Sequence, residues 1–229
     1  MNLDWLLQAL KYTDTKIEQI VNHLKHLEIL DNTILIITSD HGEPFAENGH
    51  LGHGYFLNDT LINVPLIINF PKLFSRTRIE ELVQSIDIFP TLVEILNLET
   101  SGLSDCQGVI LPPFNNRNRE FIISERYKDM YSLKTKYPNL DLDHMESLEN
   151  DRKTAIRTKK IKYIESELGN DELYEISKDP FEINNLISSK PETLSKLKLE
   201  LELWRSSFKP SKKKVKQAAN FCQSIIDVA

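Results

Sequence analysis

The sequence is poor in cysteine and carries no surplus of basic residues, and both features exclude classes of protein. Its 229 residues include only two cysteines, Cys106 and Cys222, which are too few for a disulfide framework. Neither lies in a CxxC pair that could bind a metal through thiolates. The formal net charge of -6 argues against a general nucleic-acid binder, which needs an excess of cations on one face.

Long apolar runs are also missing, so the sequence predicts no membrane-spanning helix. The first residues, MNLDWLLQALKYTD, include Asp4 and no basic start, which is unlike a secretory leader. We therefore expect a cytoplasmic protein from the sequence as it stands. A periplasmic or exported protein is the alternative if the natural chain begins further upstream.

The first half of the sequence alternates between helical and strand patterns. Apolar residues spaced by three and four over residues 4–30 predict a helix that lies on a sheet. Short continuous apolar runs at 33–38 and 64–70 predict strands of a parallel sheet covered on both faces. Asp87 is the expected N-cap of a helix over 88–98. Together these elements predict an α/β layer fold.

The last third of the sequence has a different pattern. The short runs EFIIS, KTAIRT, KIKYIES and ELYEIS predict a small, largely antiparallel sheet. Apolar residues from Leu194 to Phe208 then predict a closing amphipathic helix. We accordingly predict an α/β core over residues 1–118, an antiparallel subdomain with its closing helix over 119–208, and a basic tail over 209–229.

Candidate catalytic chemistry is concentrated directly after the first predicted strand. Asp40 and His41 offer a carboxylate oxygen and an imidazole nitrogen, which suit a divalent metal but do not complete a site. His50 and His53 follow in a glycine-rich loop, where imidazoles could hold an anionic substrate or protonate a leaving group. Taken alone, a loop histidine is more often solvated or bound to a backbone carbonyl than catalytic, but the concentration of Asp, His and Gly after one strand favours chemistry here.

Several segments, in this order, resemble the sulfatases and their relatives in the alkaline phosphatase superfamily. They are TSDHGE with GHLGHG, LNDTLINVPLIINFP, SIDIFPTLVEILNL and ELYEISKDPFEINNL, and they span roughly residues 8–187. The resemblance implies part of an alkaline-phosphatase-like sheet layered with helices, followed by the antiparallel subdomain.

The resemblance also implies roles for the candidate residues. Asp40 and His41 would be the second pair of metal ligands, with calcium as the first choice of metal and manganese, zinc or magnesium as alternatives. His53 would be catalytic and contact the transferred sulfuryl or phosphoryl group, and His50 would help to bind the substrate. Arg157 lies in a late hairpin and would be structural. The substrate would be a small sulfate or phosphate ester.

Two parts of the family pattern are missing from the sequence. Neither cysteine begins the C/S-x-P-x-R motif that carries the family's formylglycine nucleophile, and Ser189 in SKPET lacks the arginine. The early strand with two acidic metal ligands is also missing. We therefore expect the C-terminal portion of a sulfatase, with the other half supplied by a separate chain or by a longer natural gene product. A phosphodiester or phosphonate hydrolase and an inactive remnant or interaction module are the alternatives.

Overall fold

The computed structural model describes residues 3–45, 47, 54–73, 75–99, 106–115, 119–127 and 151–207. The chain divides into two compact units, Met1–Asn185 and Leu186–Ala229, which are described separately. None of the described helices is long and apolar enough to cross a membrane. The predicted basic tail lies outside the described residues, and the predicted domain boundaries stay predictions.

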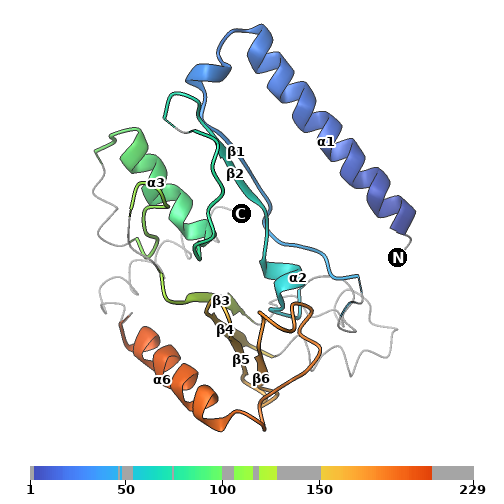
Figure 1. The fold of residues 1–229 in the computed structure, drawn as a ribbon, viewed down its shortest axis with the longest axis vertical. Coiled ribbons are helices and arrows are strands. Elements are labelled where there is room, and N and C mark those ends of the chain that lie inside the picture. The colour runs from blue at the N-terminus through green and yellow to red at the C-terminus, as the bar shows by residue number, and fades with distance from the viewer. Residues whose placement is uncertain are drawn as a thin grey trace, which may run out of the picture. The chain divides into compact units, whose positions relative to one another are not determined.

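The first unit begins with helix α1, Leu3–His26 (Figure 1). The helix ends earlier than predicted, because the chain reverses through Glu28 in the left-handed region (φ 57°) and enters the 3-10 helix η1, Leu30–Asn32. Its apolar stripe is at most half buried, and α1 packs mainly against η1. The prediction that this helix lies on a sheet is therefore wrong for the described residues.

Strands β1, Leu35–Thr38, and β2, Leu66–Asn69, form a two-stranded antiparallel sheet (Figure 1). Thr38 pairs with Leu66. The prediction of parallel strands covered on both faces is wrong here on two counts. The two strands are antiparallel, and no residue of either strand is buried. A continuous apolar run shows that a strand can be covered, but it does not specify which strand pairs with it or in which direction.

A single helical turn, α2 at Asp59–Ile62, precedes β2, and a second helical segment follows it. That segment comprises the 3-10 helix η2, Ser85–Asp87, and α3, Ile88–Ile95. Asp87 occupies the predicted N-cap position of α3, but its side chain makes no capping bond there. Its carboxylate instead accepts hydrogen bonds from the backbone of Gln84 and Val109 and pairs with Arg119.

The predicted antiparallel sheet is confirmed in the last part of the first unit. Its strands run in the order β3-β4-β5-β6 (Figure 1) and comprise Ile122–Arg126, Lys153–Arg157, Lys162–Ser166 and Glu172–Tyr174. The side chains at its centre are 0–1% exposed: Ala155, Ile156, Tyr163, Ile164 and Leu173. This sheet therefore supplies the most completely buried part of the first unit.

The second unit contains the predicted C-terminal helix, α6 at Pro191–Ser207. Proline suits the first turn of a helix, where its missing amide hydrogen costs no intrahelical bond. Leu197 and Leu201 are the buried residues of this helix.

Candidate metal site and its supporting network

Asp40 and His41 lie directly beyond β1, in a turn held by local hydrogen bonds. The backbone amide of His41 donates to Oδ1 of Asp40 at 3.0 Å, and the hydroxyl of Ser39 donates to the carbonyl of His41 at 2.7 Å. The hydrogen bond from the His41 amide is the main cause that lowers the pKa of Asp40 below its ordinary value. The carboxylate is therefore ionised at neutral pH, as a metal ligand must be.

The imidazole of His41 is oriented by a backbone contact. Its Nδ1 lies 2.7 Å from the carbonyl oxygen of Gly42, and since a carbonyl can only accept, Nδ1 carries the proton. In the neutral imidazole with this tautomer, Nε2 bears the lone pair, and it lies 3.7 Å from Oδ2 of Asp40. A backbone carbonyl on the second ring nitrogen is the usual support of a metal-binding histidine.

The separation of these two donor atoms fits a shared metal ion. Ligand atoms about 2.0–2.5 Å from one ion lie roughly 3–4 Å from each other. Within the described residues, no group of three or more His, Cys, Asp or Glu side chains is placed to hold a metal. The donor atoms of Asp40 and His41 are thus close enough to bind one metal ion, and the described part of the chain adds no third ligand of these types.

A cleft of about 660 Å³ adjoins the pair. Asp40 and His41 line it together with Asp59, Glu125 and Arg157. Most of its remaining lining comes from residues around β2, from the segment before η2, and from β3. The cleft brings charged groups from distant parts of the sequence to the side of the candidate ligands.

Gly42 fixes the candidate turn against α2. Its amide donates to the carbonyl oxygen of Leu61 at 2.6 Å. A Cβ atom at this position would collide with the carbonyl oxygen of Thr60, so only glycine permits this close approach. The chain therefore rests directly on the backbone of α2 at the residue that follows His41.

A buried cluster of four charged residues lies at the start of α2. The guanidinium of Arg157 donates to both carboxylate oxygens of Asp59 at 2.8–3.1 Å. The ammonium of Lys162 lies 2.8 Å from carboxylate oxygens of both Asp59 and Glu182. The pairing confirms a structural role for Arg157, whereas sequence reasoning missed the other three residues. Lys162 within the apolar run KIKYI was the available signal.

The environment shifts the two acids of this cluster in opposite directions. Burial acts to raise the pKa of Asp59, but the charges of Lys162 and Arg157 outweigh it, and the pKa lies below its ordinary value. Burial dominates for Glu182 and raises its pKa, against the opposing effect of Lys162.

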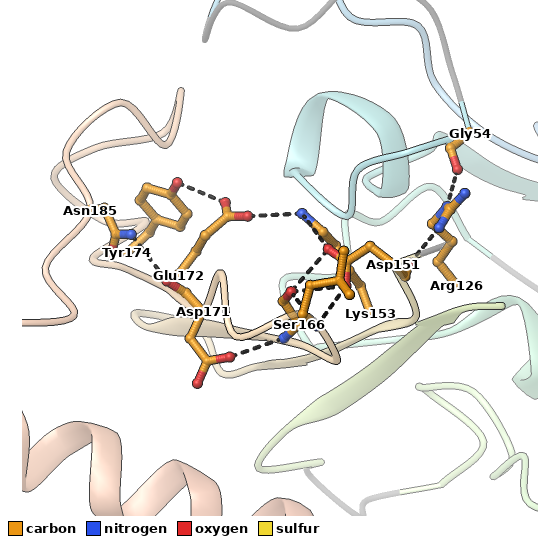
Figure 2. A network of polar contacts seen from close by, with 10 residues as sticks. Gly54, Arg126, Asp151, Lys153, Ser166, Asp171, Glu172, Tyr174 and Asn185 are labelled. Atoms are coloured by element: carbon orange, nitrogen blue, oxygen red, sulfur yellow. Dashed lines mark hydrogen bonds and ion pairs between the residues drawn. The ribbon is translucent and has the colours of Figure 1, made fainter. Parts of the chain in front are cut away.

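A second polar network crosses the antiparallel sheet (Figure 2). Arg126 donates to the backbone carbonyls of Gly54 and Asp151, so it connects β3 to the segment before α2. Lys153 lies 3.1 Å from Glu172 and 3.8 Å from Asp151, and Tyr174 donates to Glu172 at 2.8 Å. Burial is the main cause that raises the pKa of Tyr174, which keeps its hydroxyl protonated.

The structure brings together two of the four predicted site residues. Asp40 and His41 are neighbours with converging donor atoms, as described above. His50 and His53 lie outside the described residues. Gly54, which follows His53 in the sequence, is the first described residue after that gap, and its carbonyl is the acceptor for Arg126. Ser189 is exposed, and its hydroxyl donates to the carbonyl of Leu186.

Comparison with known proteins relates this arrangement to a family. Residues 2–98, which include Asp40 and His41, match the family model named Sulfatase. Over these residues the chain is similar to the sulfatases. Arylsulfatase K from Bos taurus is 28% identical over 193 residues, which are 82% of this chain and 34% of that protein. The chain therefore spans about a third of the length of that relative.

Solved structures are similar to this chain in fold. One is a protein in complex with its substrate D-glucosamine-2-N,6-O-disulfate; it is 25% identical, with a TM-score of 0.63 over 85% of this chain and 37% of that one. Another is a phosphonate monoester hydrolase of Agrobacterium radiobacter, 26% identical, with a TM-score of 0.63 over 84% of this chain and 38% of that one. The similarity confirms the predicted alkaline-phosphatase-like class.

Proposed function

We propose that this chain supplies one pair of metal ligands, Asp40 and His41, to a metal-dependent sulfuric ester hydrolase. The observation that carries the proposal is the 3.7 Å separation of Nε2 and Oδ2, with Nδ1 engaged by a backbone carbonyl. The pair lies within the segment that matches the sulfatase family. Calcium is the proposed metal, with manganese, zinc or magnesium as alternatives.

The chain's own residues would have separate roles in ester hydrolysis. A bound divalent ion would act as a Lewis acid and stabilise negative charge on the transferred group. Asp40 would contribute an ionised carboxylate and His41 an oriented Nε2. We further propose that His53 binds the sulfuryl group or protonates the departing ester oxygen, and that His50 assists in substrate binding.

The two donors do not make a complete centre, so the proposal includes a contribution from other polypeptide sequence. That sequence, in the same or a separate chain, would carry the C/S-x-P-x-R nucleophile and the remaining metal ligands. Two features favour such an association. Apolar side chains of α1 are exposed, including Trp5 and Leu10. In the described part of the chain, β1 pairs only with β2 and leaves its other edge available.

The first experiment tests the metal ligands directly. Mn²⁺ is titrated into the purified chain, and paramagnetic broadening of the His41 ring signals is followed by NMR. We expect broadening at His41 that is lost in Asp40→Asn. Broadening that is unchanged in Asp40→Asn would contradict the assigned pair.

The second experiment tests the reaction. Aryl sulfate hydrolysis is measured for this chain alone and after addition of a polypeptide carrying the C/S-x-P-x-R motif. We expect no turnover alone, and turnover in the mixture that is abolished by chelation and by His53→Ala. Turnover by the chain alone that survives both treatments would refute the function and its dependence on a second part.

A phosphodiester or phosphonate hydrolase is the second candidate function. It is favoured by the Asp-His ligand pair and by the similarity to the phosphonate monoester hydrolase. Rates on sulfate esters, phosphodiesters and phosphonate monoesters in the same reconstituted mixture distinguish the two. An inactive remnant or interaction module is the third candidate; it predicts no turnover on any of these esters.

A further inference from the structure

The turn that carries the candidate ligands is supported by α2 rather than by its own strand alone. Gly42 follows His41 directly, and its amide hydrogen bond to Leu61 is short, at 2.6 Å. The absent side chain at Gly42 lets the turn lie against the carbonyl of Thr60. A displacement of α2 would therefore move the backbone on which the His41 imidazole depends, because the carbonyl of Gly42 also accepts from Nδ1.

Helix α2 cannot hold its own position. It comprises four residues, Asp59–Ile62, and one helical turn is not stable without tertiary contacts. Its first residue, however, has three attachments outside the helix. Arg157 and Lys162 bind its carboxylate, and Glu182 accepts from its backbone amide at 2.5 Å. These attachments come from the antiparallel sheet and from the segment that follows it.

The sheet makes this attachment specific to a carboxylate at position 59. Arg157 ends β4 and Lys162 begins β5, and the two residues lie directly opposite each other in the sheet. Like charges at opposed positions destabilise a sheet. The carboxylate of Asp59 contacts both cations and so reduces the repulsion between them. Glu182 is paired with Lys162 and not with Arg157. Electrostatics therefore fixes the start of α2 to one corner of the sheet.

We propose that Asp59 is a positioning residue for the candidate metal pair: it attaches α2 to the sheet, and α2 in turn holds the turn of Asp40 and His41. The inference rests on the proposed function only in treating those two residues as metal ligands. If the role of Asp59 were purely structural, its replacement would lower the free energy of unfolding of the whole unit without a selective effect on the turn.

The experiment compares Asp59→Asn with a matched control, Asp87→Asn. Asp87 is also a buried carboxylate that pairs with an arginine, Arg119, at 2.5 Å, and it accepts hydrogen bonds from the backbone of Gln84 and Val109, which lie outside α2. Two quantities are measured on the intact chain: hydrogen exchange of the Gly42 amide relative to core amides of β4 and β5, and the Mn²⁺ concentration that half-broadens the His41 ring signals.

For Asp59→Asn we expect faster relative exchange at Gly42 and a rise of about tenfold in the Mn²⁺ midpoint, the size of effect usual for groups that orient metal ligands. For Asp87→Asn we expect neither change. Gly42→Ala disrupts the contact between the turn and α2 directly, because the added Cβ collides with the carbonyl oxygen of Thr60. It should raise the Mn²⁺ midpoint without altering the charge cluster. If Asp59→Asn does not fold, Asp59→Glu and Gly42→Ala carry the test.

The results separate the inference from the proposed function. Wild-type behaviour of Asp59→Asn, or equal effects in Asp87→Asn, would overturn the positioning role. If Mn²⁺ broadening at His41 does not depend on Asp40, the metal assignment fails. Exchange at Gly42 would still decide whether Asp59 holds the turn.

Discussion

The β1–β2 ribbon and the β3–β6 sheet have contrasting degrees of burial. No residue of β1 or β2 is buried, and Ile67 in β2 is 54% exposed. In the antiparallel sheet, by contrast, central side chains such as Ile156 and Ile164 are fully buried. The candidate ligands follow the ribbon, so the residues expected to do the chemistry lie on the part with less packing of its own.

The contrast shows why the two regions need each other. A two-stranded ribbon is marginally stable by itself, and the turn of Asp40 and His41 extends beyond its end. The sheet supplies the missing support through Arg157 and Lys162, which bind Asp59 at the start of α2. The buried sheet thus anchors α2, and the exposed ribbon leads into the candidate ligands.

Loss of the arginine that joins the two regions should have the largest effect. Arg157→Met removes the bidentate partner of Asp59 and leaves that carboxylate with Lys162 alone, and breaking a buried ion pair on one side costs about 3–5 kcal/mol. Arg78→Met is the matched control, because its ion pair with Glu80 is exposed and such pairs contribute about 0–1 kcal/mol. Urea unfolding measures both; equal losses would show that the cluster is not a structural anchor.

Truncation of apolar side chains tests the difference in packing itself. Ile164→Ala removes a fully buried side chain of β5 and should lower the free energy of unfolding by about 2–5 kcal/mol. Ile67→Ala in β2 removes a side chain that is already more than half exposed, so we expect a loss below about 1 kcal/mol. Similar losses at the two positions in urea unfolding would contradict the contrast.

Acid should weaken the anchor at Asp59 selectively. Because its pKa in the folded chain is lowered below 3.8, its stabilising contribution is complete above that pH and is lost as the pH falls further. The stability difference between wild type and Asp59→Asn should therefore shrink below pH 3.8 in urea unfolding. A difference that stays constant with pH would contradict the assignment.

Glu182→Gln provides a comparison of opposite sign. Burial raises the pKa of Glu182 above 4.5, so its ionisation opposes folding as the pH rises from 4.5 through the folded pKa. The variant should gain stability relative to wild type over that interval. A relative loss there would show that the ion pair with Lys162 outweighs burial.

Metal should have the smallest effect on overall stability. Two protein ligands bind a divalent ion weakly, and a ligand present at its dissociation constant adds only about 0.4 kcal/mol to the free energy of unfolding. Unfolding of the chain with calcium and with chelator should therefore agree within about 0.5 kcal/mol. A much larger stabilisation would mean that the described pair is only part of an already complete site within this chain.

The sequence by itself determined the local features of this protein. Alternating short strands predicted the sheet of β3–β6, a helical apolar pattern predicted α6, and adjacency alone put Asp40 beside His41. It also carried the family motifs. These features depend on residues close in sequence, where periodicity and turn chemistry act directly. The roles of His50 and His53 stay predictions.

Only the tertiary structure decided how the regions are joined. It paired β1 with β2 antiparallel, placed Gly42 on α2, and brought Asp59 to Lys162, 103 positions away in the sequence. No local pattern specifies such contacts, because a charged residue alone does not reveal which distant residue will neutralise it. The burial that makes the charge cluster energetically important exists only after the sheet has formed.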